Sequence, residues 1–215
     1  MIIPNNFLIN KLWWSQFPFH LRLITKIRFF ASFGAGGVIY LTSLIFNNIG
    51  LSATEIGLGF TISAIIGTIT RFFTGNYLNK TGKIQKPLVT SSLISITAGF
   101  FLIISKDSYS YIIGQALIGA AAGIYWPSTE FAVPYFCHPI DTRKAYALVR
   151  SSEALGIFLG VFIGGFMNNF IYLKSIFIND IFCMITIIFL ILRNKSSIQI
   201  TLENSQRKVL DLIDS

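Results

Sequence analysis

The sequence predicts an all-α membrane protein with six transmembrane helices, and three observations lead to this fold class. Of the 215 residues, 53% are hydrophobic and only 12% are charged, whereas soluble domains carry roughly twice that charged fraction. Six apolar stretches come close to the roughly 20 residues that a helix needs to cross the hydrocarbon core. Lysine and arginine gather in alternate connections between these stretches, as in loops on the cytoplasmic side of a membrane.

The six apolar stretches are expected to be helices rather than strands. Each is apolar at both odd and even positions, whereas a transmembrane β-strand alternates apolar and polar residues. The fourth stretch can continue past Pro127 toward Phe136 with a kink. The expected spans are Phe29–Phe46, Ile56–Leu78, Leu88–Ser105, Tyr109–Trp126, Ala145–Met167 and Ser175–Leu192.

The positions of the basic residues predict the orientation. They precede the first stretch, fill the second and fourth connections and follow the sixth stretch, while the opposite side holds only Lys106 and Lys174. The bias places both termini in the cytoplasm and the chain in the cell's inner membrane. The net charge of +8 is thereby explained by topology, so we expect a lipid bilayer around the chain and no nucleic-acid partner.

The chain is accordingly divided into a cytoplasmic N-terminal interfacial segment (residues 1–28), a six-helix transmembrane domain (29–193) and a cytoplasmic tail (194–215). Trp13 and Trp14 among basic residues favour a short interfacial helix in the first segment. Because Pro18 interrupts this segment, a loose tail is the alternative.

The connection between the second and third spans carries the most specific pattern. It reads Gly75-Asn-Tyr-Leu-Asn79-Lys80-Thr-Gly82-Lys83. This resembles the signature of the major facilitator superfamily, which is Gly, three residues, Asp, a basic residue, one residue, Gly and a basic pair. Gly75 would permit close helix approach and Gly82 a tight turn.

Two positions depart from that signature. Asn79 replaces the acid that latches the inner face in the family, so only a hydrogen bond or a helix cap remains open to it. Ile84 occupies the second basic position.

The fifth span contains a second resemblance to the same family. Glycines at four-residue spacing resemble its antiporter-type signature, although Val161 stands where that signature has proline. Such glycines lie on one helical face and let a neighbouring backbone approach, and ordinary helix packing is the alternative interpretation. The glycines are Gly156, Gly160, Gly164 and Gly165.

The resemblance extends from Phe29 to Arg193 and corresponds to the N-terminal six-helix half of a family member. Gln115 replaces the arginine of the family's fourth-helix signature, so a standard proton-coupled mechanism is not expected. Members have two such halves with the solute between them near the membrane midplane. The resemblance therefore implies transport of a small solute by alternating access, with a second copy of the chain or a second six-helix chain as partner.

Polar residues within the spans are the candidates for a cavity, since ionisable groups in a membrane are costly. Gln115, Gly119, Trp126 and Glu130 are predicted to form one stripe on the fourth helix. Arg150 can pair with Glu153, or with Glu130 if the fourth and fifth helices are neighbours; structural ion pairs near the headgroups are the alternative. Asp180 is expected to be peripheral. The cavity or ion-pair candidates are Arg71, Gln115, Trp126, Glu130, Arg150 and Glu153.

Three classes of function follow. A solute transporter leads, and a non-transporting membrane assembly or scaffold protein or a truncated transporter remnant is the alternative. An enzyme is not expected, because an intramembrane serine protease needs a histidine within the spans and both His20 and His138 are expected outside them. Neither a phosphate-binding glycine loop nor His and Cys at metal-ligand spacing is present, so we expect no cofactor and no metal.

Overall fold

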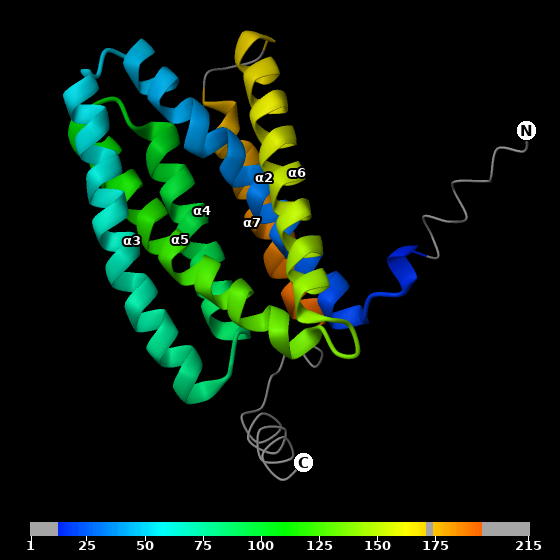
Figure 1. Ribbon diagram of the computed structural model, residues 1–215. Coiled ribbons are helices and arrows are strands. Elements are labelled where there is room, and N and C mark those ends of the chain that lie inside the picture. The colour runs from blue at the N-terminus through cyan, green and yellow to red at the C-terminus, as the bar shows by residue number, and fades with distance from the viewer. Residues whose placement is uncertain (1–12, 171–173, 195–215) are drawn as a thin grey trace, which may run out of the picture.

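The computed structural model describes residues 13–170 and 174–194, and within these residues it contains six long helices and no strand (Figure 1). All except α5 are long and apolar enough to cross a membrane. The all-helical, multi-pass class is therefore confirmed, while the predicted tail from 195 onward and residues 1–12 lie outside the described part. The helices are α2 (Phe19–Asn48), α3 (Ala53–Thr81), α4 (Gln85–Ile104), α5 (Ser108–Phe136), α6 (Thr142–Phe170) and α7 (Ser175–Arg193).

The first long helix begins at Phe19 rather than at Phe29, which is a correction to the expected span. Leu21, Ile24 and Ile27 are fully buried, and their three-residue spacing continues the apolar face of the helix toward its N-terminus. Arg28 therefore lies inside α2 and not before it. His20 is the second residue of this helix and not outside it.

The limits of the other helices follow from local hydrogen bonds. Ser52 and Glu55 form a capping box at the start of α3, where the Ser52 backbone N–H donates to the Glu55 carboxylate at 2.8 Å. The same helix ends at Gly82, whose φ of 63° is left-handed. Asp107 begins α5 by accepting a hydrogen bond from the Ser110 backbone N–H at 2.7 Å.

Lys174 joins the C-terminal end of α4 to the start of α7. It lies immediately before α7, is buried, and donates hydrogen bonds from its ammonium group to the backbone oxygens of Ile103, at 2.8 Å, and Ser105. These carbonyls belong to the C-terminal end of α4, where a cation complements the helix dipole.

The helices alternate in direction, so the connections α3–α4 and α5–α6 lie at the same end of the bundle as the start of α2 (Figure 1). Extensive contacts join α3 to α5, α2 to α6, α4 to α5, α2 to α7 and α4 to α7. The first three helices correspond to the last three: α2 to α5, α3 to α6 and α4 to α7. Replacing each helix by its counterpart gives the same five contacting pairs. Because three is odd, the two triplets have opposite orientation, as in an inverted repeat.

Glycines allow the closest helix contacts. A Cβ built on Gly156 would lie 2.7 Å from the Phe29 carbonyl oxygen, and one on Gly160 would meet the Phe33 carbonyl oxygen. Gly164 is similarly tight, at 3.0 Å from Leu41. α2 and α6 thus approach along the glycine face. Gly165, by contrast, has no described atom within 4 Å of such a Cβ.

Candidate functional site

Four charged side chains from α2, α5 and α6 form a closed ring. The Arg28 guanidinium donates to Glu130 at 2.7 Å and to Glu153 at 2.9 Å. Arg150 contacts the same two carboxylates at 2.9 and 3.0 Å. Two cations and two anions therefore alternate around the ring, and each carboxylate oxygen in it is shared between two guanidinium groups.

The ring connects α2, α5 and α6, and Arg28 is its buried member. Only 2% of the Arg28 side chain is exposed, and its guanidinium lies 4.1 Å above the centre of the Trp126 ring. Thr129 accepts a further hydrogen bond from the same group. The Arg28 charge is thus matched by partners on every side, which a buried ion needs to offset its loss of hydration.

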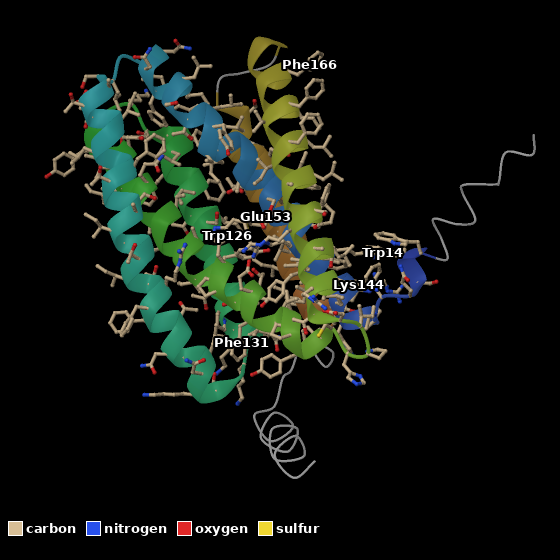
Figure 2. The ribbon with its side chains drawn as sticks, viewed as in Figure 1. Trp14, Trp126, Phe131, Lys144, Glu153 and Phe166 are labelled. Carbon is tan, nitrogen blue, oxygen red and sulfur yellow. The ribbon has the colours of Figure 1, made fainter. Side chains whose placement is uncertain are left out.

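The ring forms one wall of a polar groove of about 500 Å³. Figure 2 shows Trp126 and Glu153 close together between α5 and α6. A second groove adjoins it and shares Gly75, Pro127 and Glu130. The residues lining the first groove are Arg28, Arg71, Gly75, Trp126, Pro127, Glu130, Arg150 and Glu153.

Five of the predicted cavity residues are therefore brought together at one place. Trp126, Glu130, Arg150 and Glu153 line the groove from α5 and α6, and Arg71 lines it from α3. Arg150 pairs with Glu153 one turn along α6 and with Glu130 of α5. Arg71 is exposed and makes no ion pair or hydrogen bond with the described residues. Their contact with a solute stays a prediction.

The predicted stripe on the fourth helix does not face a single cavity, which corrects that expectation. Gln115 is only 2% exposed, and its amide nitrogen has no hydrogen-bond partner among the described residues. Gly119 packs against the Ser63 backbone of α3. The cause is that α5 lies between α3 and α4, so the N-terminal half of the stripe is covered by helix packing.

The signature between α3 and α4 is only partly explained by this bundle. Gly82 makes the predicted turn, and Lys80 and Lys83 are exposed beside it. Gly75 has no described atom within 4 Å of a built Cβ, so it is not a helix-contact position here but part of the groove wall. Asn79 is exposed and neither caps α3 nor makes a side-chain hydrogen bond within the described part of the chain.

Arg28 was not among the predicted site residues. Its position before an apolar run made it resemble a flanking cytoplasmic cation. The buried spacing of Leu21, Ile24 and Ile27 was the signal that the helix starts earlier. That spacing places Arg28 about 14 Å along α2 from Phe19, at 1.5 Å per residue, and therefore within the span.

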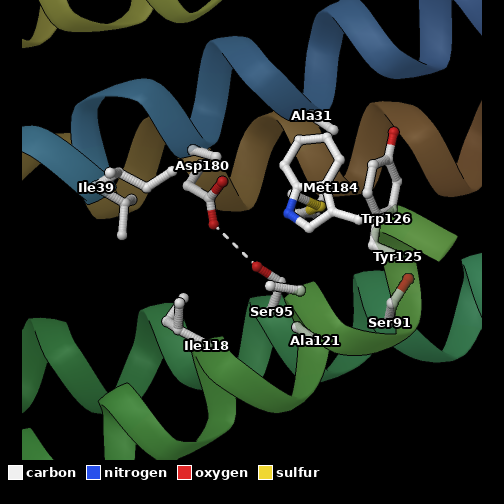
Figure 3. A pocket seen from close by; sticks show the side chains of 13 residues that line it. Ala31, Ile39, Ser91, Ser95, Ile118, Ala121, Tyr125, Trp126, Asp180 and Met184 are labelled. Atoms are coloured by element: carbon white, nitrogen blue, oxygen red, sulfur yellow. Dashed lines mark hydrogen bonds between the residues drawn. The ribbon is translucent and has the colours of Figure 1, made fainter. Parts of the chain in front are cut away.

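A second polar position lies deeper in the bundle, and here the expectation for Asp180 was wrong. Asp180 is not peripheral: it is 2% exposed and lines a small cavity of about 90 Å³ between α2, α4, α5 and α7. Figure 3 shows its carboxylate pointing to Ser95, whose hydroxyl donates to it at 3.1 Å. The other carboxylate oxygen, Oδ1, has no hydrogen-bond partner among the described residues.

The comparisons with known proteins agree with this architecture. The family model of the Major Facilitator Superfamily matches residues 27–210, which include α3 to α7 and most of α2. No curated protein sequence matches the chain. Proteins of this family are membrane transporters and not enzymes. With its multi-pass helical bundle, its inverted repeat and a family match over most of its length, the chain belongs to the major facilitator superfamily.

Proposed function

We propose that the chain moves a small solute across the membrane by alternating access, as one six-helix half of a transporter. The observation that carries this proposal is the charged groove. Four of its five charged side chains lie on helices long and apolar enough to cross a membrane, and an ionised group in hydrocarbon costs about 3 kcal/mol. A groove of this kind is favourable only if water and a second protein wall cover it.

The second wall is best supplied by another six-helix unit. A second copy inserted in the same orientation gives a two-fold dimer, and a separate six-helix chain is the other possibility. The helices that flank the groove support such a contact, because each presents large exposed apolar side chains. These are Phe72 and Phe73 on α3 and Phe158 and Phe162 on α6.

We further propose that the chain lies in the inner membrane and crosses it six times, with α5 as the fourth span. Both termini are then in the cytoplasm. The basic connections at one end of the bundle support this topology. Single cysteines at Asn48 and Asp107, in a protein lacking Cys137 and Cys183, should react with an impermeant reagent from outside. Cysteines at Lys80 and Lys144 should react only after permeabilisation, and labelling of Lys80→Cys in intact cells would refute the topology.

Transport is tested with proteoliposomes loaded with a defined mixture of sugars, amino acids, organic acids and nucleosides. Release of one component, compared with empty liposomes, supports the proposal. Gly75→Trp should abolish this release, because it fills the groove at a position with open space and leaves helix packing intact. Gly165→Trp is the matched control, since this glycine also has open space but lies outside the groove.

The mass of the particle in a nanodisc decides the partner. Two copies of the 24.0 kDa chain, crosslinked through a cysteine at Gly75, support the dimer. A monomer that transports a solute refutes the need for a second wall. A stable monomer without flux favours the alternative, a non-transporting scaffold or a transporter remnant.

A further inference from the structure

The charges that line the groove do not balance. Arg28 and Arg150 are matched by Glu130 and Glu153 within the closed ring. Arg71 is the fifth charged residue of the lining, and it has no carboxylate partner among the described residues. The groove therefore carries one surplus positive charge, which Arg71 contributes from α3.

This surplus charge lies well inside the span. Arg71 is about 15 Å from the end of α3 at Thr81, at 1.5 Å per residue. Its guanidinium is therefore far from the lipid headgroups at that end of the helix. One turn further along the same face, Gly75 leaves open space in the groove wall. A positive group with unused donors thus borders an empty volume, a combination that favours an incoming anion.

The residues around Arg71 suit a particular kind of anion. A guanidinium presents parallel N–H donors that match the two oxygens of a carboxylate or phosphate. Arg150, whose side chain is 57% exposed, has its charge matched by Glu130 and Glu153, so the net positive charge of the lining comes from Arg71. Trp126 and Pro127 offer apolar surface between the two arginines. Glu130 and Glu153 repel an anion only weakly, because both are neutralised within the ring.

We propose that this groove binds an anionic solute, one that carries a carboxylate or phosphate group beside an apolar part, and that Arg71 is its main contact. The proposal rests on the proposed transport function, because it takes the groove as the solute's path. It also assigns the class of solute.

The test uses Trp126 as a local probe. Changing Trp13 and Trp14 to Phe leaves it as the one tryptophan, since the chain has three. This protein is placed in nanodiscs of neutral phosphatidylcholine and titrated with benzoate, phenyl phosphate and the neutral benzyl alcohol at constant ionic strength. We expect a saturable change of Trp126 fluorescence with the two anions and none with the alcohol.

Matched variants then locate the contact. Arg71→Gln should weaken binding of the anions by about tenfold or more, the loss expected for a charge-assisted hydrogen bond. This variant should fold, because Arg71 has no ion-pair or hydrogen-bond partner among the described residues that its removal would leave unpaired. Lys144→Gln removes the same charge from an exposed position outside the groove and should leave the affinity unchanged. Arg71→Lys, which keeps the positive charge, should keep part of the affinity for the anions.

Three outcomes would overturn the proposal. Equal responses to benzoate and benzyl alcohol would show that charge is not recognised, and an unchanged affinity in Arg71→Gln would place the contact elsewhere. A response that depends on Arg71 but arises only from phosphatidylglycerol in the nanodisc would assign the site to a lipid headgroup. Because binding is measured without flux, its failure with intact solute release would reject the anion and leave transport standing.

Discussion

Two buried ionisable side chains in the same bundle are held in opposite ways. Arg28 is 1% exposed and Asp180 is 2% exposed, yet Arg28 has two carboxylates, a hydroxyl and an aromatic face around it. Asp180 has one hydrogen bond, from Ser95, and one oxygen without a partner. The first charge is stabilised by opposite charge and the second is confined by packing.

The two sites contribute to the stability of the bundle in different ways. The ring around Arg28 connects α2, α5 and α6 through directional contacts, so removing one member leaves buried charges unmatched. Asp180 lies where α7 presses on α2, and a Cβ on Gly34 would come within 3.0 Å of the Asp180 Cα. Volume matters more than charge at that contact.

The largest expected effect comes from breaking the ring. Arg28→Met fills a similar volume but leaves Glu130 and Glu153 with only the exposed Arg150 between them. We expect the folded state to lose about 3–5 kcal/mol, the usual effect of removing one partner of a buried pair. Thermal unfolding in a mild detergent measures this loss. If Arg28→Met melts like the wild type, the ring is not structural.

A double variant separates charge from packing at the same place. Adding Glu153→Gln to Arg28→Met removes one of the stranded carboxylates, so part of the stability should return. A double variant that is less stable than Arg28→Met alone would contradict the ring as the cause of the loss.

The next effect should come from volume at the other site. Gly34→Ala places a methyl group against Asp180 and Cys183, where the Cys183 Cβ would be 3.2 Å away. We expect a loss of about 1–3 kcal/mol, the range for overpacking a tight contact. Gly57→Ala is the control, because Gly57 has open space around its Cβ position. Equal stability of the two variants would show that α2 and α7 separate easily.

Removing the Asp180 charge should cost much less than removing that of Arg28. Asp180→Asn keeps the shape and still accepts the hydrogen bond from Ser95, while it removes a charge that has no ionic partner among the described residues. We expect a stability within about 1 kcal/mol of the wild type or above it. A loss of stability as large as that of Arg28→Met would mean that Asp180 is paired with a cation. The two sites would then be stabilised in the same way.

The smallest effect is expected at an exposed pair. Asp141 accepts hydrogen bonds from the Arg143 guanidinium at 3.0 Å and from its backbone N–H at 2.8 Å, and both lower the Asp141 pKa, the side-chain bond more. Its stabilisation is therefore present above the ordinary aspartate pKa of 3.8 and is lost as the pH falls through the lowered value.

Salt distinguishes this exposed pair from the ring. Arg143→Gln should change the melting temperature by little, and added salt should remove even that difference, since exposed pairs are screened. The effect of Arg28→Met should persist at the same salt concentration. A salt-sensitive ring would show that water reaches it as freely as it reaches Asp141.

The sequence predicted the helices better than the site, for physical reasons. Length and apolarity fix each span locally, so α3, α4, α6 and α7 differ from expectation by only a few residues at their ends. α5 continues past Pro127 to Phe136, which was expected only as a possible continuation. The pairing of Arg150 with Glu130 was foreseen as a consequence of neighbouring helices. Arg28, in contrast, could not be identified from charge placement alone, because a cation before an apolar run is typical of a cytoplasmic flank.

The burial of Gln115 and the open space at Gly75 escaped prediction for another reason. Both depend on which helices pack together, and α5 lies between α3 and α4 by a tertiary arrangement that no local pattern specifies. The inverted repeat that produces this arrangement is visible in the contacts between helices and not in any short motif.

The hydrogen bonds of Lys174 have a mechanical consequence. They tie the C-terminal end of α4 to the start of α7, whereas the ring ties α2, α5 and α6 nearer the opposite end of the bundle. The described bundle is thus braced at two levels, with different members fastened at each. We expect these contacts to resist sliding of the helices past one another, so that the six helices move as one rigid body. We therefore expect motion during transport to occur at the open groove rather than inside the bundle.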